Sequence, residues 1–136
     1  MDRQPPGESA TAVNVTSALS GRIPGGGRII NLSSQAARAG GGAYGAAKAA
    51  IESWTAGLAP EVGRQGIMVN VIAPGLADDT DFYRRPISSE VRARLLAADA
   101  NGREAMPDDV AALVVFVASA DAGHITGQVL SVNGGA

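Results

Sequence analysis

Tyr44 and Lys48 are the two residues of this sequence whose types and spacing suggest proton-transfer chemistry. They stand four positions apart, which places both side chains on one face of a helix. A phenol ordinarily titrates near pH 10, and an adjacent ammonium favours the phenolate and lowers the pKa of the phenol. The pair could therefore give or take a proton near neutral pH. Lys48 is also the only lysine of the chain, and an arginine cannot easily replace a compact ammonium beside a phenol.

On spacing alone, a helix-surface pair without a role is the simpler interpretation of Tyr44 and Lys48. The preceding segment adds weight, because Ser33 and Ser34 end an aliphatic run just before the glycine-rich loop that leads to Tyr44. A hydroxyl at that place could donate a hydrogen bond to a substrate carbonyl beside the phenol. Taken by themselves, the serines are ordinary strand-end residues, so the elements that position this cluster decide its meaning.

The helix that must carry Tyr44 and Lys48 is the clearest element of the sequence. Alanine is abundant between 44 and about 64, and apolar residues recur there at helical spacing, namely Ala47, Ile51, Trp54 and Leu58. Pro60 interrupts the pattern, and an interior proline removes a backbone hydrogen bond at a cost of about 3 kcal/mol. We therefore expect this helix to kink or to end near Pro60.

The other elements alternate between apolar strands and helices. The second predicted strand is stopped by Pro74 and Gly75, and the three predicted strands cover 28–33, 67–73 and 128–132. Two further helices are predicted, one at 89–98 with Ser89 as its cap and one at 107–119 with acidic residues in its first turn. Of the remaining segments, 1–10 is expected to be a disordered lead-in, 11–19 a short helix or strand, and 76–86 a loop.

Helices between continuously apolar strands indicate an α/β fold. We predict a partial Rossmann-like, three-layer structure with a short parallel sheet of about three strands and flanking helices. A chain of 136 residues is long enough for one domain with a modest core, so 11–136 is expected to form a single unit. A sheet this small would keep an unpaired edge, which favours association with another chain.

The composition argues against several classes of function. The net charge is -2 with no block of like charge, so neither nucleic acid nor a membrane surface is an expected partner. The longest apolar run, 110–118, is too short to span a bilayer. The chain has no cysteine and a single histidine, His124, so we expect neither a disulfide nor a metal site. The absence of cysteine is compatible with the cytoplasm, which is the expected compartment.

Five segments, in order, resemble the short-chain dehydrogenase/reductase family. They are GRIINLSS at 27–34, YGAAKAA at 44–50, GIMVNVIAPG at 66–75, DDVA at 108–111 and ITGQVLSVNGG at 125–135. The resemblance covers about residues 11–136. Five motifs in the right order are far more specific than one tyrosine–lysine pair.

The resemblance implies a role for each matching residue. Tyr44 would be the general acid/base, and Lys48 would lower its pKa and bind the nicotinamide ribose. Ser34 would orient the substrate carbonyl, with Ser33 as the second choice, and Asn14 would support a proton-relay water. The nicotinamide ring would be lined by Pro74, Gly75 and Thr80.

The implied reaction is a hydride transfer between NAD or NADP and a small-molecule carbonyl or alcohol. The family's phosphate-binding glycine motif, between a first strand and helix, is not found in this sequence. The chain thus looks like the carboxy-terminal, catalytic portion of such an enzyme without its dinucleotide-binding half. We expect a homo-oligomer or association with another chain, and an activity that is impaired or partner-dependent.

Two other functions remain open at this stage. The chain could be a non-enzymatic interaction subunit that oligomerises through its open sheet edge. It could also be a non-redox enzyme, such as a cyclase or isomerase, that uses Tyr44 and Lys48 for proton transfer alone.

Overall fold

The computed structural model describes residues 7–19, 21–77 and 88–136. Its order of elements confirms the predicted alternation of strands and helices. The sheet is built from β1 (Arg28–Leu32), β2 (Met68–Pro74) and β3 (Val129–Val132). The longer helices are α1 (Gly7–Leu19), α2 (Gly42–Gly63), α3 (Ser89–Ala98) and α4 (Pro107–Ala118), and the short 3-10 turns are η1 (Gln35–Ala37) and η2 (Ala120–Ala122).

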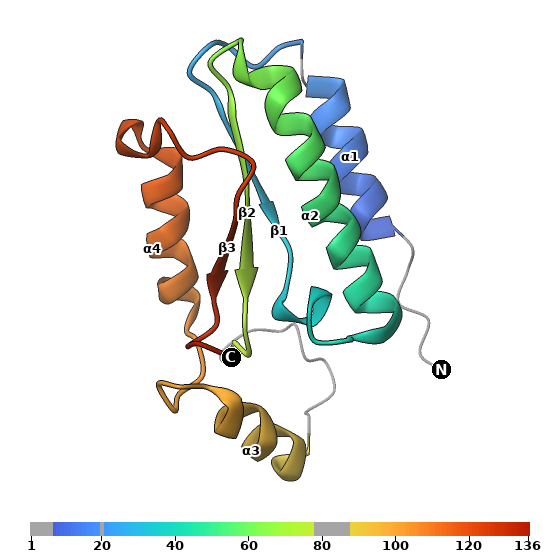
Figure 1. Cartoon of the computed structure of the whole chain (residues 1–136), viewed down its shortest axis with the longest axis vertical. Helices are drawn as coiled ribbons and strands as arrows, with labels where there is room; N and C mark the ends of the chain where they lie inside the picture. Colours follow the sequence, from blue (N-terminus) through green and yellow to red (C-terminus); the bar gives the residue numbers. More distant parts are fainter. Residues whose placement is uncertain (1–6, 20, 78–87) are drawn as a thin grey trace.

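The three strands form one parallel sheet in the order β1-β2-β3, with Ile30 opposite Asn70 and Ile72 opposite Leu130. Figure 1 shows α1 and α2 side by side on one face of this sheet and α4 on the other. The central strand β2 is therefore covered on both sides, and Val69, Val71 and Ile72 are fully buried. A strand buried on both faces needs a mostly apolar run, and β2 has one apart from Asn70, whose side-chain amide bonds to the backbone of Ile125 and Gln128. The predicted three-layer α/β fold is confirmed.

Helix α2 packs on the sheet through residues at helical spacing: Ile51, Thr55, Ala59 and Val62 are buried. The helix ends at Gly63, so it runs past Pro60 instead of ending there. Pro60 and Ala56 are both exposed. Because the carbonyl that Pro60 leaves without a helical donor belongs to Ala56, water can bind it, and the helix continues.

The boundaries of the other helices differ from the predictions by small amounts. The segment 11–19 is helical, and α1 begins at Gly7, so residues 7–10 of the expected lead-in belong to this helix. Helix α3 has the predicted bounds, but its cap is Ser88 and not Ser89, because the Ser88 hydroxyl accepts a hydrogen bond from the backbone N–H of Val91. Of the predicted loop 76–86, all but residues 76 and 77 lies outside the described residues.

No helix in the described ranges combines the length and the apolar character needed to cross a bilayer. The sheet has two edges, β1 and β3. The strands run in one direction, and α2 runs back against them, so the first turns of α2 lie at the carboxyl end of β1 (Figure 1). In open α/β sheets ligands bind at this end of the strands.

Candidate functional site

Tyr44 and Lys48 lie together in the first turns of α2. The Lys48 ammonium is 5.6 Å from the centre of the Tyr44 ring, which is within the range of a cation–π interaction. Both residues are half-buried, so each is held by the protein while it remains accessible. The structure thus brings together the two side chains that the spacing placed on one helix face. This pair is the candidate site for proton transfer.

The carboxyl end of β1 also holds Lys48. The Lys48 Nζ donates a hydrogen bond to the backbone carbonyl of Leu32 at 3.3 Å. This bond joins α2 to the strand whose end carries Ser33 and Ser34. The position of the ammonium therefore depends on the last residue of β1.

Ser33 and Ser34 make different hydrogen bonds. Ser33 is buried, and its hydroxyl donates to Glu52 Oε1 at 2.8 Å and lies 3.3 Å from the carbonyl oxygen of Lys48. The Ser34 hydroxyl caps η1, where it accepts from the backbone N–H of Ala36 at 3.2 Å. A hydroxyl that accepts one bond still carries a hydrogen that it can donate. Ser34 is thus better placed than Ser33 to donate to a substrate carbonyl.

Glu52 and Arg38 brace this part of the fold, and the sequence did not single them out. Glu52 Oε1 accepts from Ser33 while Glu52 Oε2 lies 3.5 Å from Arg38 Nε. One carboxylate on α2 therefore holds both the end of β1 and the loop that follows it. The only sequence signal is that Glu52 follows Lys48 by four positions and so shares its helix face.

Glycine allows the loop between Ser34 and Tyr44 to close on α2. A Cβ atom on Gly45 would lie 2.4 Å from the carbonyl oxygen of Ala36, and one on Gly41 would lie 2.7 Å from the Ala36 Cβ. Neither distance is possible without movement of the backbone, so η1 can press against the start of α2 only because these positions are glycine. The loop is short, and this contact fixes Ser34 relative to the helix of Tyr44.

Pro74 and Gly75 lie where β2 ends. The Gly75 N–H donates to the carbonyl of Val132 at 2.9 Å. A Cβ atom on Gly75 would be 2.9 Å from the Cα of Asn133 and 3.0 Å from Gln35 Oε1. The ends of the three strands therefore converge at Gly75. Thr80, the third residue expected at the nicotinamide, lies outside the described residues.

Asn14 is separated from this cluster. It is an exposed residue of α1. A cleft of about 650 Å³ runs between α1, β1 and α2, and Lys48 lines it together with Val15, Ile30 and Leu32, but Asn14 does not. The structure brings Lys48 to this cleft without bringing Asn14 to it.

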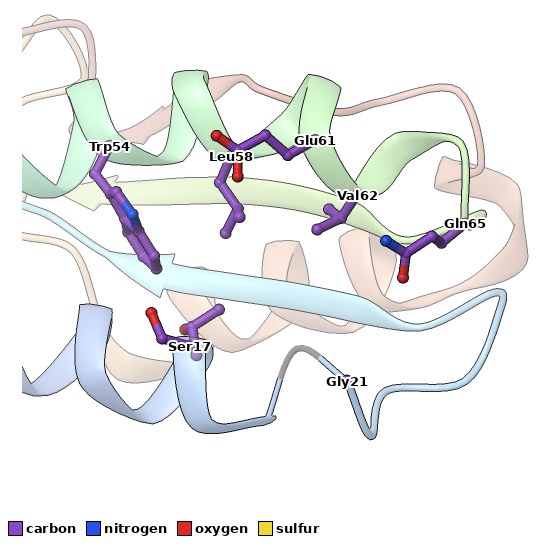
Figure 2. Close-up of a pocket in the computed structure, with 8 residues that line it drawn as sticks. Ser17, Gly21, Trp54, Leu58, Glu61, Val62 and Gln65 are labelled. Carbon is purple, nitrogen blue, oxygen red and sulfur yellow. The ribbon is translucent and has the colours of Figure 1, made fainter.

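A second pocket, of about 410 Å³, lies farther along α2. Figure 2 shows Trp54 and Leu58 of α2 on one side of it and Ser17 of α1 on the other. Neither Tyr44 nor Lys48 lines it, so it is separate from the tyrosine–lysine pair. In the described parts of the chain, no three or more His, Cys, Asp or Glu side chains gather as metal ligands would.

A large pKa shift among the described residues belongs to Asp109, which lies outside this site. Arg103 donates two hydrogen bonds to the Asp109 carboxylate, at 2.7 and 2.9 Å, and the backbone N–H of Met106 donates a third. These bonds, that from Arg103 first, lower the pKa of Asp109 from 3.8 to about 2. The group stabilises the start of α4 and has no part in the chemistry at Tyr44.

The fold and the site define a class of protein, namely an α/β protein with a tyrosine–lysine pair at the carboxyl edge of a parallel sheet. A family model described as enoyl-(acyl carrier protein) reductase matches residues 8–136. The chain belongs to the short-chain dehydrogenase/reductase family.

Characterised relatives agree with this assignment. The chain is 41% identical over 127 residues to the short-chain reductase protein NovJ of Streptomyces niveus, covering 84% of this chain and 46% of that protein. It is 43% identical over 112 residues to the 3-oxoacyl-(acyl-carrier-protein) reductase FabG of Escherichia coli K12, covering 80% and 45%. The chain therefore spans about half the length of the curated relatives it matches.

The chain also matches solved structures over about half of their length. A blue fluorescent protein from a metagenomic library, in complex with NADPH, superimposes with a TM-score of 0.83 at 35% identity, over 93% of this chain and 51% of that one. A short-chain dehydrogenase from Burkholderia cenocepacia J2315, in complex with NADP, gives 0.83 at 34% identity, over 93% and 52%. The predicted Rossmann-like fold is confirmed at the level of these relatives.

Proposed function

We propose that this chain carries the proton-transfer part of an NAD(P)-dependent oxidoreductase that interconverts a small-molecule carbonyl and the corresponding alcohol. The observation that carries the proposal is the placement of the Lys48 ammonium 5.6 Å from the centre of the Tyr44 ring. Two relatives are named as reductases, and two solved relatives hold NADPH or NADP. Carbonyl reduction needs both a hydride and a proton, and this chain offers the group that moves the proton.

In the reducing direction, Tyr44 donates its hydroxyl proton to the carbonyl oxygen as that oxygen gains negative charge. A bound nicotinamide cofactor would supply the hydride to the carbonyl carbon. Ser34 donates a hydrogen bond to the same oxygen and so orients the carbonyl. Lys48 stabilises the tyrosinate that is left, and in the oxidising direction the tyrosinate takes the proton back from the alcohol.

The described residues fit one end of the cofactor. The half-exposed Lys48 ammonium can bind ribose hydroxyls, and Pro74 and Gly75 stand where the strand ends converge. Nothing in the sequence offers the glycine turn at the start of a helix that would cradle a pyrophosphate. We therefore propose that these 136 residues bind the nicotinamide end and that polypeptide outside them supplies the phosphate cradle.

A nicotinamide fluorescence titration tests this proposal. We expect NADPH or NADH to bind when the phosphate-binding polypeptide is present, and Lys48→Met to weaken the binding because the ribose loses a charged donor. Arg64→Met, on the exposed end of α2, is the matched control and should leave the affinity unchanged. Absence of binding at millimolar cofactor, with the chain folded by circular dichroism and the polypeptide present, refutes the redox function.

The open edge of β1 favours a second candidate function, an interaction subunit that associates through this edge without turnover. The expected states are a homo-oligomer or a complex with another chain. Light scattering on the purified chain measures this directly, and a stable monomer that binds no other chain would exclude it.

A further inference from the structure

The side chain of Gln35 reaches from the end of β1 to Gly75, where the ends of the strands converge. Gln35 follows Ser34 directly and is the first residue of η1. A Cβ atom on Gly75 would be 3.0 Å from Gln35 Oε1, so the amide lies against the backbone that leaves β2. Ser34 and Gln35 are therefore neighbours at the end of the sheet where ligands of open α/β folds bind.

The amide of Gln35 has hydrogen-bonding capacity that the described chain does not use. Within 7–19, 21–77 and 88–136, no group bonds to this amide. The buried side-chain atoms without a partner in these ranges are Arg28 Nε and Glu104 Oε2, so the half-buried Gln35 keeps its amide in contact with solvent. A ligand can therefore bind the amide without breaking a contact within the described chain.

Other polar side chains at the strand ends bond within the protein. Asn31 and Ser33, near the end of β1, donate to side chains of α2, and Asn133, at the end of β3, bonds to the backbone that follows it. Ser34 keeps a hydroxyl hydrogen that it can donate, and the Gln35 amide offers both donors and an acceptor. These two adjacent side chains can thus bind two polar groups of one ligand.

The backbone that presents Gln35 is held at several points. The Gln35 carbonyl accepts from the N–H groups of Arg38 and Ala39 at 3.0 and 3.1 Å. The Ser34 hydroxyl caps η1, and the turn packs against Gly45 of α2. A side chain on a backbone held in this way loses less freedom when it binds a ligand, so it can discriminate between similar ligands.

We propose that Gln35 is a specificity-determining residue, and that it selects carbonyl substrates that carry a hydroxyl group on the carbon next to the carbonyl. This inference rests on the function proposed above, in which Ser34 donates to the carbonyl oxygen. The neighbouring hydroxyl can both donate to and accept from the Gln35 amide. An apolar group in the same place would displace water from the amide and return no hydrogen bond, which weakens binding.

An NMR titration of the ¹⁵N-labelled wild-type chain tests this contact without any cofactor. Hydroxyacetone and 2-butanone have nearly the same shape and differ by a hydroxyl in place of a methyl group. We expect hydroxyacetone to shift the side-chain amide signal of Gln35 and 2-butanone to leave it almost unchanged. Gln65 is exposed just beyond the end of α2 and serves as the internal control, because its amide signal should respond to neither ketone.

Turnover provides the second readout, namely NADPH oxidation by this chain together with the polypeptide that supplies the phosphate cradle. Gln35→Leu should lower the ratio of kcat/KM for hydroxyacetone to that for 2-butanone at least about tenfold, since leucine has a similar size but no hydrogen-bonding group. Damage to the fold alone would slow both ketones alike, so the ratio reports the hydrogen bond. Gln65→Leu should leave this ratio unchanged.

The inference is overturned if the Gln35 signal responds equally to both ketones or to neither, or if Gln35→Leu turns over both with an unchanged ratio. That last result would leave the proposed oxidoreductase standing. A shift at Gln35 that is specific to hydroxyacetone, without NADPH binding or turnover, would refute the oxidoreductase and support the Gln35 contact. The titration uses the wild-type chain, so it decides the question even where Gln35→Leu does not fold.

Discussion

Ser33 and Ser34 lie between β1 and η1, and their hydroxyls have different hydrogen-bond partners. Ser33 is buried against Glu52, whereas Ser34 caps a 3-10 turn at the surface of the site. A buried hydroxyl bonded to a carboxylate contributes to stability, because its loss leaves the carboxylate with one partner fewer. The Ser34 hydroxyl contributes to catalysis if it orients the substrate.

We therefore predict opposite phenotypes for two neighbouring alanine variants. Ser34→Ala should reduce kcat at least about tenfold with a small change in Tm, since one transition-state hydrogen bond is worth on the order of 10²-fold in rate. Ser33→Ala should lower the free energy of unfolding by about 1–3 kcal/mol. Thermal unfolding and NADPH oxidation measure the two effects. If Ser33→Ala shows the larger rate effect and no loss of stability, the assignment of the two serines is wrong.

Asp109 gives a prediction about pH. Its pKa is lowered to about 2 in the folded chain, first by the hydrogen bonds from Arg103 and then by that from Met106, against an ordinary value of 3.8. A carboxyl whose pKa is lower in the folded state adds stability above its unfolded pKa and loses it as the pH falls through the folded one. Asp109→Asn should therefore lower Tm at neutral pH, and the deficit should shrink between pH 4 and pH 2.

Asp108→Asn is the matched control for this titration, because Asp108 shares the first turn of α4 and its dipole but not the bonds to Arg103. It should show a smaller deficit at neutral pH. A deficit for Asp109→Asn that does not change between pH 4 and pH 2 would contradict the role of these hydrogen bonds.

At the level of elements, the packing of η1 on α2 decides where Ser34 sits relative to Tyr44. Gly45→Ala would place a Cβ 2.4 Å from the Ala36 carbonyl, so η1 must move away. We predict a loss of about 1–3 kcal/mol in the free energy of unfolding, as for other overpacked contacts, together with a lower kcat. Chemical denaturation and NADPH oxidation measure the two changes.

Gly57 on the same helix is the control for Gly45. A Cβ at Gly57 meets no atom within 4 Å, and the residue is exposed. Gly57→Ala should therefore stabilise the chain by about 0.5–1 kcal/mol through helix propensity. The opposite signs distinguish a steric effect at Gly45 from a general effect of alanine in α2. Equal signs would show that η1 and α2 are not in tight contact.

The elements also show what a sequence can predict. Apolar strand cores and helices with clear start signals, such as α3 and α4, are set by local pattern and were predicted to within one or two residues. The segment 11–19 stayed ambiguous because its apolar residues favour neither period, and α1 becomes helical where it packs on α2. The tolerance of Pro60 depends on which side of α2 faces water, and this is a property of the folded chain.

Part of the candidate site could likewise be predicted from the sequence, and part could not. Tyr44 and Lys48 could be paired from spacing because both lie on one helix. Glu52 contacts both Ser33 and Arg38, and no local sequence pattern links these three residues. Their contacts are therefore seen only in the structure. The preference for Ser34 over Ser33 likewise rests on which hydroxyl is buried.

At the scale of the whole molecule, the described residues combine a family fold with a three-stranded parallel sheet. The chain belongs to the short-chain dehydrogenase/reductase family and spans about half the length of its curated relatives. Lys48 contacts both the Tyr44 ring and the backbone carbonyl of Leu32 at the end of β1. Lys48 therefore connects helix α2, which carries Tyr44, to the end of β1.

The most direct test is the rate of NADPH oxidation by this chain together with the polypeptide that supplies the phosphate cradle, with ethyl acetoacetate as a probe 3-oxo substrate. Tyr44→Phe removes only the phenolic hydroxyl. We predict that Tyr44→Phe slows turnover at least about 100-fold without loss of NADPH binding, since general acid catalysis contributes 10²–10⁴-fold. Turnover by Tyr44→Phe at the wild-type rate, or no turnover by the wild-type chain, would contradict the proposed role of Tyr44.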